Sequence, residues 1–505
     1  MASFISASAF STLAGMVSLV FGFLSSVIVA RLLGAEGTGT VAFGLWVAMT
    51  ASTVANLGVP AILTRYMPTY DCPGNPGGGL ARAVLKRFAV PFALTTLALI
   101  GYVAWTMQNG ALSEYSPGVW AMIIFLFIAY GLAAVAEAAA RGLNRFDETT
   151  RLAFYGCLIQ VPLIIVGAYF FGIVGALAGY VVRHVPQAFR LLHYIRKRPE
   201  PGTYVQDKMR AHGRNDWFSD VVGLLVWGRI EILFIGLYFS TTEIGYYAAG
   251  LTLAGLVVQL PTQMVAALTP HIGRHHDNRD VARINQTYQR VMRWLTILIV
   301  PVCFGGAAIM PVLLPLLFGN EFTPAVAMAA VVVASAFTTA LSLVPALTIG
   351  ARERSDFYLY STPVVAALSI CALALAVPHS GGLGAAWVRF AIHGIWLTWL
   401  VAFCWLRLDI RLNLLELAKI GLSGLLCAAC AFAVLQSVYG MTGLVLAVTA
   451  GALAYFSALR LFHCIPKEDV QALADNLPSV LPNRLARFGT SFLMLLVPGR
   501  GARQA

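Results

Sequence analysis

Apolar residues along this chain are gathered into long runs, and polar residues are concentrated in the short segments between them. A helix that crosses a bilayer needs about 20 predominantly apolar residues, and its backbone polar groups must find their partners within the segment. About fourteen runs meet this requirement, so the pattern predicts an all-α polytopic membrane protein. The runs lie near residues 9–33, 39–62, 86–106, 118–140, 152–171, 172–193, 216–239, 244–269, 292–318, 323–349, 357–378, 382–406, 413–438 and 441–463.

Composition and charge placement support this interpretation. Of the 505 residues, 59% are hydrophobic and 11% charged, whereas soluble domains are about 25% charged. A soluble enzyme, a disordered chain and a disulfide scaffold do not fit these values. With the N-terminus inside, about 30 of the 34 Lys and Arg fall on the cytoplasmic side, which follows the positive-inside rule. An even number of spans then places both termini in the cytoplasm, and the net charge of +12 predicts contact with anionic lipid and not a nucleic-acid partner.

Three weak matches at nearly one spacing predict an internal duplication: 39–44 with 245–250, 141–145 with 350–354, and 175–184 with 384–393. An even number of spans per copy gives both copies the same orientation. We therefore expect two six-helix bundles in a pseudo-two-fold arrangement, plus two extra C-terminal helices. The predicted divisions are an N-terminal bundle 1–193, a basic cytoplasmic linker 194–215, a second bundle 216–406, two additional helices in 407–463, and a cytoplasmic tail 464–505 with an interfacial helix.

Three arginines fall inside the predicted spans. A charge at the bilayer centre costs about 2.5–3.5 kcal/mol on insertion scales, so it usually faces a cavity or a partner. Arg183, Arg229 and Arg389 lie roughly 10–16 Å below the outer face, and Arg31 lies at an outside mouth. Guanidinium forks suit phosphate and carboxylate, so these residues predict a cationic substrate cavity. The alternative is that each arginine is structural, bonded to backbone carbonyls or to one acid.

Glu231 is the acid closest to these arginines. It lies two residues from Arg229, and on one continuous helix the two side chains would point about 200° apart. We therefore expect Glu231 to pair across the cavity or to act as a coupling site, unless it is a plain structural ion-pair member. His184 and His393 are expected to be packing residues and not proton carriers, so they are weaker candidates for the functional site.

No catalytic group, metal site or cofactor is expected. Cys427 and Cys430 form a C-x-x-C within a span, but no second pair of ligands accompanies them. A membrane glycosyltransferase or polymerase would need catalytic groups in sizeable outside loops, and the predicted outside loops are mostly a few residues long. A channel would need a filter-like loop, which is lacking, whereas a scaffold role remains open.

Short motifs mark the ends of the predicted spans: 29–34 with Gly39, 56–60 with Arg65, 141–146, Arg229-x-Glu231 with 245–247, and 317–322. Taken together they resemble the polysaccharide transporter family. Its members are the O-antigen (Wzx-like) and exopolysaccharide-repeat flippases of the multidrug/oligosaccharidyl-lipid/polysaccharide exporter superfamily. The chain departs from the family pattern at Glu231, where an Asp is commoner.

This resemblance implies a V-shaped pair of six-helix bundles that works by alternating access in the bacterial inner membrane. The implied substrate is an undecaprenyl-diphosphate-linked oligosaccharide, with the cavity arginines meeting the diphosphate or acidic sugars. The implied coupling ion is a proton or sodium. Polysaccharide polymerase or export proteins would be partners of a monomeric chain. Lipid II, another superfamily substrate, or a scaffold role are the alternatives, while cationic drugs fit a positive cavity poorly.

Overall fold

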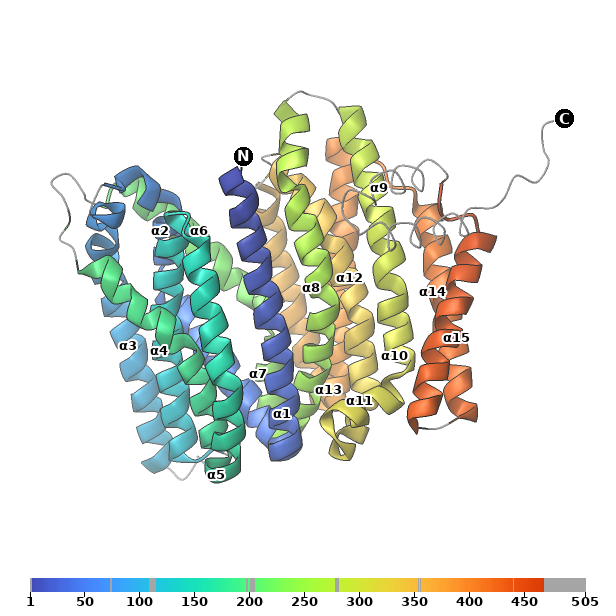
Figure 1. Cartoon of the computed structure of the whole chain (residues 1–505), viewed down its shortest axis with the longest axis horizontal. Helices are drawn as coiled ribbons and strands as arrows, with labels where there is room; N and C mark the ends of the chain where they lie inside the picture. Colours follow the sequence, from blue (N-terminus) through green and yellow to red (C-terminus); the bar gives the residue numbers. More distant parts are fainter. Residues whose placement is uncertain are drawn as a thin grey trace. The chain divides into compact units, whose positions relative to one another are not determined.

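The computed structural model describes residues 2–72, 75–108, 115–196, 199, 205–277, 281–352, 354, 356–438 and 440–466. Within these residues the secondary structure is helical and no β-strand forms, which confirms the predicted all-α class (Figure 1). Nearly all of the predicted tail 464–505 and part of the predicted linker lie outside the described residues. The α-helices are α1 (Ala2–Ala55), α2 (Val59–Tyr66), α3 (Leu80–Gln108), α4 (Pro117–Gly142), α5 (Phe146–Ile195), α6 (Asp207–Trp227), α7 (Glu231–Tyr238), α8 (Thr241–Asp277), α9 (Val281–Val300), α10 (Gly306–Ala308), α11 (Met310–Phe318), α12 (Val326–Ala351), α13 (Asp356–Leu408), α14 (Leu414–Ser437) and α15 (Gly440–Leu461).

Ten of the described helical segments are long and apolar enough to cross a membrane. Three of them, Gly15–Ala55, Phe146–Ile195 and Asp356–Leu408, have 41, 50 and 53 residues, whereas one crossing needs about 20. Each contains one left-handed glycine that interrupts the helix. An eleventh crossing forms if α6 and α7, bent by 54° at a short break, are taken as one span. Counting each interrupted segment as two crossings gives fourteen, in agreement with the sequence prediction.

The interruption of α5 at Gly172 shows how one residue makes a turn. Gly172 has a φ of 59°, a conformation that costs little without a Cβ. The chain reverses so sharply there that Gly167 and Gly175 meet backbone to backbone. The adjoining spans predicted at 152–171 and 172–193 therefore form a tight hairpin.

The predicted repeat is visible in the backbone. The left-handed glycines of α5 and α13, Gly172 and Gly381, are 209 residues apart and have φ of 59° and 55°. Between α4 and α5, the N–H of Arg145 donates to the carbonyl five residues earlier at 2.9 Å. Between α12 and α13, Arg354 makes the same bond at 3.2 Å, again 209 residues later. The two copies thus share the glycine conformation of the long hairpin and this hydrogen bond of the preceding turn.

Helices α1 and α8 touch through their backbones at two glycines. A Cβ on Gly39 would overlap the carbonyl oxygen of Thr241 and lie 2.8 Å from the amide nitrogen of Gly245. A Cβ on Gly245 would overlap the carbonyl oxygen of Ala35 and lie 3.0 Å from the nitrogen of Gly39. Both pairs of residues are 206 apart, so the contact is reciprocal, as expected where equivalent parts of two repeats face each other.

The chain packs into two compact units that do not follow chain order. In the first, the rings of Phe88, Phe92 and Phe127 stack in series inside an apolar core, with centroids 4.7 and 4.4 Å apart. The predicted division at residues 193 and 216 stays a prediction. The first unit consists of Met1–Thr252, Phe318–Phe322 and Phe357–Val388, and the second of Leu253–Leu317, Thr323–Asp356 and Arg389–Ala505.

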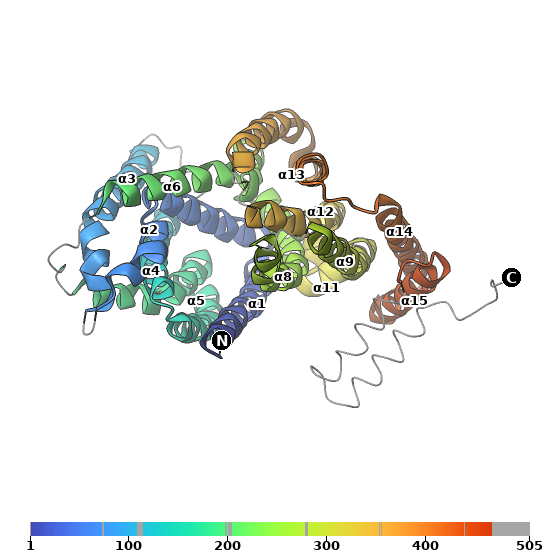
Figure 2. The same ribbon diagram turned by 90° about the horizontal axis from the view of Figure 1, so that it is seen from above.

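Helices α14 and α15 of the second unit lie side by side (Figures 1 and 2). Pro301 follows α9 and has no N–H, so the carbonyl oxygen of Ile297 loses its usual helical donor. The hydroxyl of Tyr455 in α15 donates to that oxygen at 2.8 Å. Arg293 of α9 also pairs with Glu416 of α14 at 2.7 Å. Each of the two extra helices thus contacts α9 through a specific polar interaction.

Candidate functional site

Arg183 lies in the second half of α5, where the hairpin sets it against the first half of the same helix. Its Nη1 donates to Oε1 of Gln160 at 3.4 Å, and Gln160 is completely buried. The two halves approach closely because Gly156 has no side chain, and a Cβ there would overlap the Arg183 carbonyl oxygen. Arg183 is about 16 Å along the helix from the turn at Gly172. A permanent cation is therefore held deep within a span by a neutral amide.

Neutral polar groups surround this arginine. The rings of Tyr130 in α4 and His184 meet edge to face, with centroids 5.1 Å apart. Tyr130, His184 and Tyr180 all lie within electrostatic reach of Arg183. The Nε2 of Gln160 is buried and has no hydrogen-bond partner in the described part of the chain. The group combines one cation, several neutral partners and one unused donor.

The charge of Arg183 is not balanced by an acid. Within the described residues its one hydrogen bond is to Gln160, and no carboxylate forms an ion pair with it. The ion-pair alternative is therefore not realised there for Arg183. A guanidinium at membrane depth requires water or an anion as its complement, so this arrangement is suited to an anionic group.

Arg229 and Glu231 do not share one continuous helix, and the expectation of a fixed angle between them is wrong. Arg229 is exposed and has a φ of 61° in the break between α6 and α7, and Glu231, 4% exposed, begins α7. The indole N–H of Trp46 in α1 donates to the Gly228 carbonyl at 3.0 Å. The next turn starts afresh with the N–H of Ile232 bonded to the Arg229 carbonyl at 3.0 Å. Trp46 thus stabilises the break.

The remaining predicted residues are distributed over both units. Arg31 is exposed and precedes the left-handed Gly34 of α1, and Arg65 is exposed with its guanidinium 5.8 Å from the Tyr66 ring centroid. Both belong to the first unit with Arg183 and Arg229, whereas Arg389 is half-buried in the second. The shared cationic cavity therefore stays a prediction.

The two histidines occupy equivalent places in the repeats. His184 contacts Tyr130, and His393, 209 residues later, lies with Nδ1 2.7 Å from the hydroxyl oxygen of Thr339. Thr339 is itself 209 residues after Tyr130. His184 of α5 thus contacts α4, and His393 of α13 contacts α12.

Metal-ligating residues are scattered. Cys427 is buried and packed closely against two glycines: a Cβ on Gly305 or Gly451 would lie 3.2 or 3.3 Å from its sulfur. Cys430 is exposed. In the part of the chain that the structure describes, no three His, Cys, Asp or Glu side chains are grouped to hold a metal ion.

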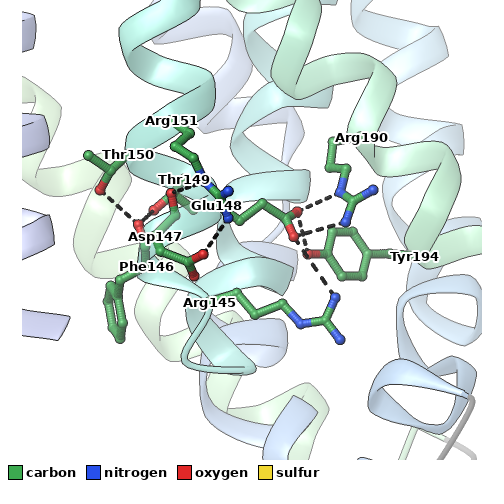
Figure 3. Close-up of polar contacts among 9 residues, drawn as sticks. All are labelled: Arg145, Phe146, Asp147, Glu148, Thr149, Thr150, Arg151, Arg190 and Tyr194. Carbon is green, nitrogen blue, oxygen red and sulfur yellow. Dashed lines mark hydrogen bonds and ion pairs between the residues drawn. The ribbon is translucent and has the colours of Figure 1, made fainter. Parts of the chain in front are cut away.

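Sequence reasoning missed a polar cluster at the other end of the α5 hairpin (Figure 3). Glu148 accepts hydrogen bonds from Nε and Nη2 of Arg190 at 2.6 and 2.9 Å, and from the Tyr194 hydroxyl at 2.9 Å. Arg145 lies 3.9 Å from the same carboxylate. One acid therefore ties together both ends of α5. The available signal was an acid in the first turn of a predicted hairpin, opposite an Arg and a Tyr four residues apart.

Glu148→Gln is expected to lower the free energy of unfolding by about 1–2 kcal/mol, because it removes the charge that Arg190 and Tyr194 share. The Glu148 side chain is only 15% exposed. Thermal unfolding of the purified protein in a neutral detergent measures the loss. Asp147→Asn is the matched control, because the Asp147–Arg151 pair is exposed and its loss should cost less than about 0.5 kcal/mol. Equal losses in both variants would contradict a special role for Glu148.

A family model described as polysaccharide biosynthesis protein matches residues 28–327, which is more than half of the chain. No curated protein matches the chain by sequence.

Solved structures share the fold. The lipid II flippase MurJ in an inward closed conformation aligns with a TM-score of 0.67 and 12% identity, over 90% of this chain and 98% of MurJ. An inward-facing multidrug resistance MATE family transporter of the MOP superfamily aligns with a TM-score of 0.60 and 12% identity, over 82% and 99%. A MOP superfamily transporter from Pyrococcus furiosus aligns with a TM-score of 0.57 and 12% identity, over 81% and 95%. At these identities the likeness establishes the fold.

Proposed function

Because the chain belongs to the polysaccharide biosynthesis protein family, we propose that it is a flippase for an undecaprenyl-diphosphate-linked oligosaccharide. It is a multi-pass membrane protein with the fold of MOP superfamily exporters. In this proposal an O-antigen or exopolysaccharide repeat unit crosses the bacterial inner membrane by alternating access, and both termini are cytoplasmic.

The observation that carries this proposal is the unbalanced charge of Arg183. A cation held within a span by Gln160 and not by an acid needs water or an anion as its complement, and a substrate with a charged group would supply the anion. A diphosphate offers several oxygens to the planar guanidinium fork. Arg183 would thus meet the one strongly charged part of an otherwise neutral or apolar substrate as it passes through the bilayer.

The other predicted residues take supporting roles in the proposal. Arg229, Arg389 and Arg31 contribute further positive charge along the substrate path. Glu231 is the coupling residue for a proton or sodium ion, and its burial beside a helix break supports that role. His184, His393 and Arg65 are weaker candidates for contact with the substrate or the coupling ion.

Reconstitution tests the proposal directly. Vesicles containing the purified chain and a fluorescent undecaprenyl-diphosphate-linked oligosaccharide are exposed to an outside quencher, under a proton or a sodium gradient. We expect the quenched fraction to rise above that of protein-free vesicles. Movement of fluorescent lipid II alone would assign the second candidate substrate. No movement of either lipid under either gradient would contradict the flippase and favour the scaffold alternative.

A further inference from the structure

The inner turns of the two repeats share backbone hydrogen bonds but differ in some of their side chains. The N–H of Leu143 donates to the carbonyl four residues earlier at 3.2 Å, and that of Arg352 does the same at 3.2 Å, 209 residues later. Leu143 packs against the apolar core of the first unit. An arginine therefore stands at the end of α12, in the place where the first repeat has an apolar residue.

The guanidinium of Arg352 has an unused edge. Its Nε and Nη2 are both buried and, within the described residues, neither has a hydrogen-bond partner. These two N–H groups point the same way and form one side of the planar fork. Leaving charged donors buried without an acceptor is costly, and such a site calls for a specific explanation.

Other arginines of this chain use the same edge to hold a carboxylate. Nε and Nη2 of Arg190 bind Glu148 at 2.6 and 2.9 Å, and those of Arg354 bind Asp356 at 3.1 and 3.2 Å. The residue 209 positions after Glu148 is Phe357, which is buried and apolar. The position of Glu148 is thus apolar in the second repeat, where Asp356 is paired with Arg354 and Arg352 is an additional cation.

We propose that Arg352 binds a phosphate group through its Nε/Nη2 edge. Phosphate matches this edge in geometry and charge. The residue lies at a span end that the charge pattern predicts to be cytoplasmic, where lipid headgroups supply phosphate and basic pockets between helices bind them. Arg352 is partly exposed as a whole, so a phosphate group can approach the residue from outside, and the flexible stem allows its buried edge to adjust to it. The phosphate belongs either to a bilayer phospholipid or to a diphosphate, and the latter source rests on the proposed function.

Binding is measured without transport, so its failure is distinguishable from failure of the flippase proposal. The full chain in a maltoside detergent, which carries no phosphate, is titrated with inorganic pyrophosphate in one arm and with short-chain phosphatidylglycerol in the other. The midpoint of thermal unfolding is recorded. We expect a saturable rise in at least one arm, and the arm that responds identifies the source.

Arg352→Ala should raise the apparent dissociation constant on the order of tenfold or more. Arg352→Lys keeps the charge without the fork and should also bind more weakly than wild type. This variant replaces Arg352→Ala in the binding measurement if the alanine variant fails to fold. Arg354→Ala is the matched control, because the Nε/Nη2 edge of Arg354 is already occupied by Asp356. The unfolding midpoint of this variant should therefore rise with ligand as it does in the wild type. No rise in either arm, or the same rise in both Arg352 variants as in wild type, would overturn the proposal.

Discussion

Gly39→Ala is expected to lower the free energy of unfolding by about 3 kcal/mol and to deplete the folded protein from membranes. The added Cβ would overlap the Thr241 carbonyl oxygen, so α1 and α8 would have to separate. Backbone atoms cannot rotate away as a flexible side chain can. Thermal unfolding in detergent and the amount of folded protein in the membrane fraction measure the effect.

Gly22→Ala supplies the control for this change within the same helix. A Cβ on Gly22 has nothing within 4 Å, and alanine favours a helix interior over glycine by about 0.5–1 kcal/mol. Gly22→Ala should therefore leave stability unchanged or raise it slightly. Because the crossing is reciprocal, Gly245→Ala should repeat the loss seen with Gly39→Ala. A stable Gly39→Ala variant would show that the two helices do not need this close approach.

Arg183→Ala is expected to reduce translocation of the lipid-linked oligosaccharide on the order of tenfold or more, through loss of the fork that meets the diphosphate. Thermal stability should hold or rise, because a cation without an acidic partner is removed from the span. Arg183→Lys keeps the charge but not the fork, so its transport rate should fall between those of the wild type and Arg183→Ala. Transport in vesicles and thermal unfolding are measured on the same preparations.

The pairing of these two measurements separates a substrate role from a structural one. If Arg183 were structural, Arg183→Ala would lose stability together with transport. Arg151→Ala removes an exposed arginine at the other end of the same hairpin and should leave transport near the wild-type rate. Normal transport by Arg183→Ala would rule out the proposed phosphate contact.

The spans are predictable from sequence because lipid imposes one rule on every residue in them. The run 118–140 corresponds to α4, Pro117–Gly142, since an apolar segment of this length has few alternatives to a helix. The break within the predicted span 216–239 is not predictable in this way. It depends on Trp46, which is 182 residues from Gly228 and reaches it only in the folded chain.

The candidate site also has residues that the sequence reveals and residues that only the folded chain reveals. Arg183 stands out in the sequence because a charge in an apolar run is conspicuous. Gln160 does not stand out, since a single amide leaves the run apolar, yet it is the residue that holds Arg183. Glu148 and Arg190 read as ordinary charges at a span end, and only the hairpin geometry reveals that they form one pair.

The left-handed glycines have a practical consequence for mapping this protein. At Gly172 the chain turns within a single interrupted helix, so no loop separates the two crossings. Proteases, inserted epitopes and reporter fusions all depend on a segment that can leave the membrane surface. A topology map built from such tools would find both ends of α5 on the same side of the membrane and would have no reporter at the turn between its two crossings.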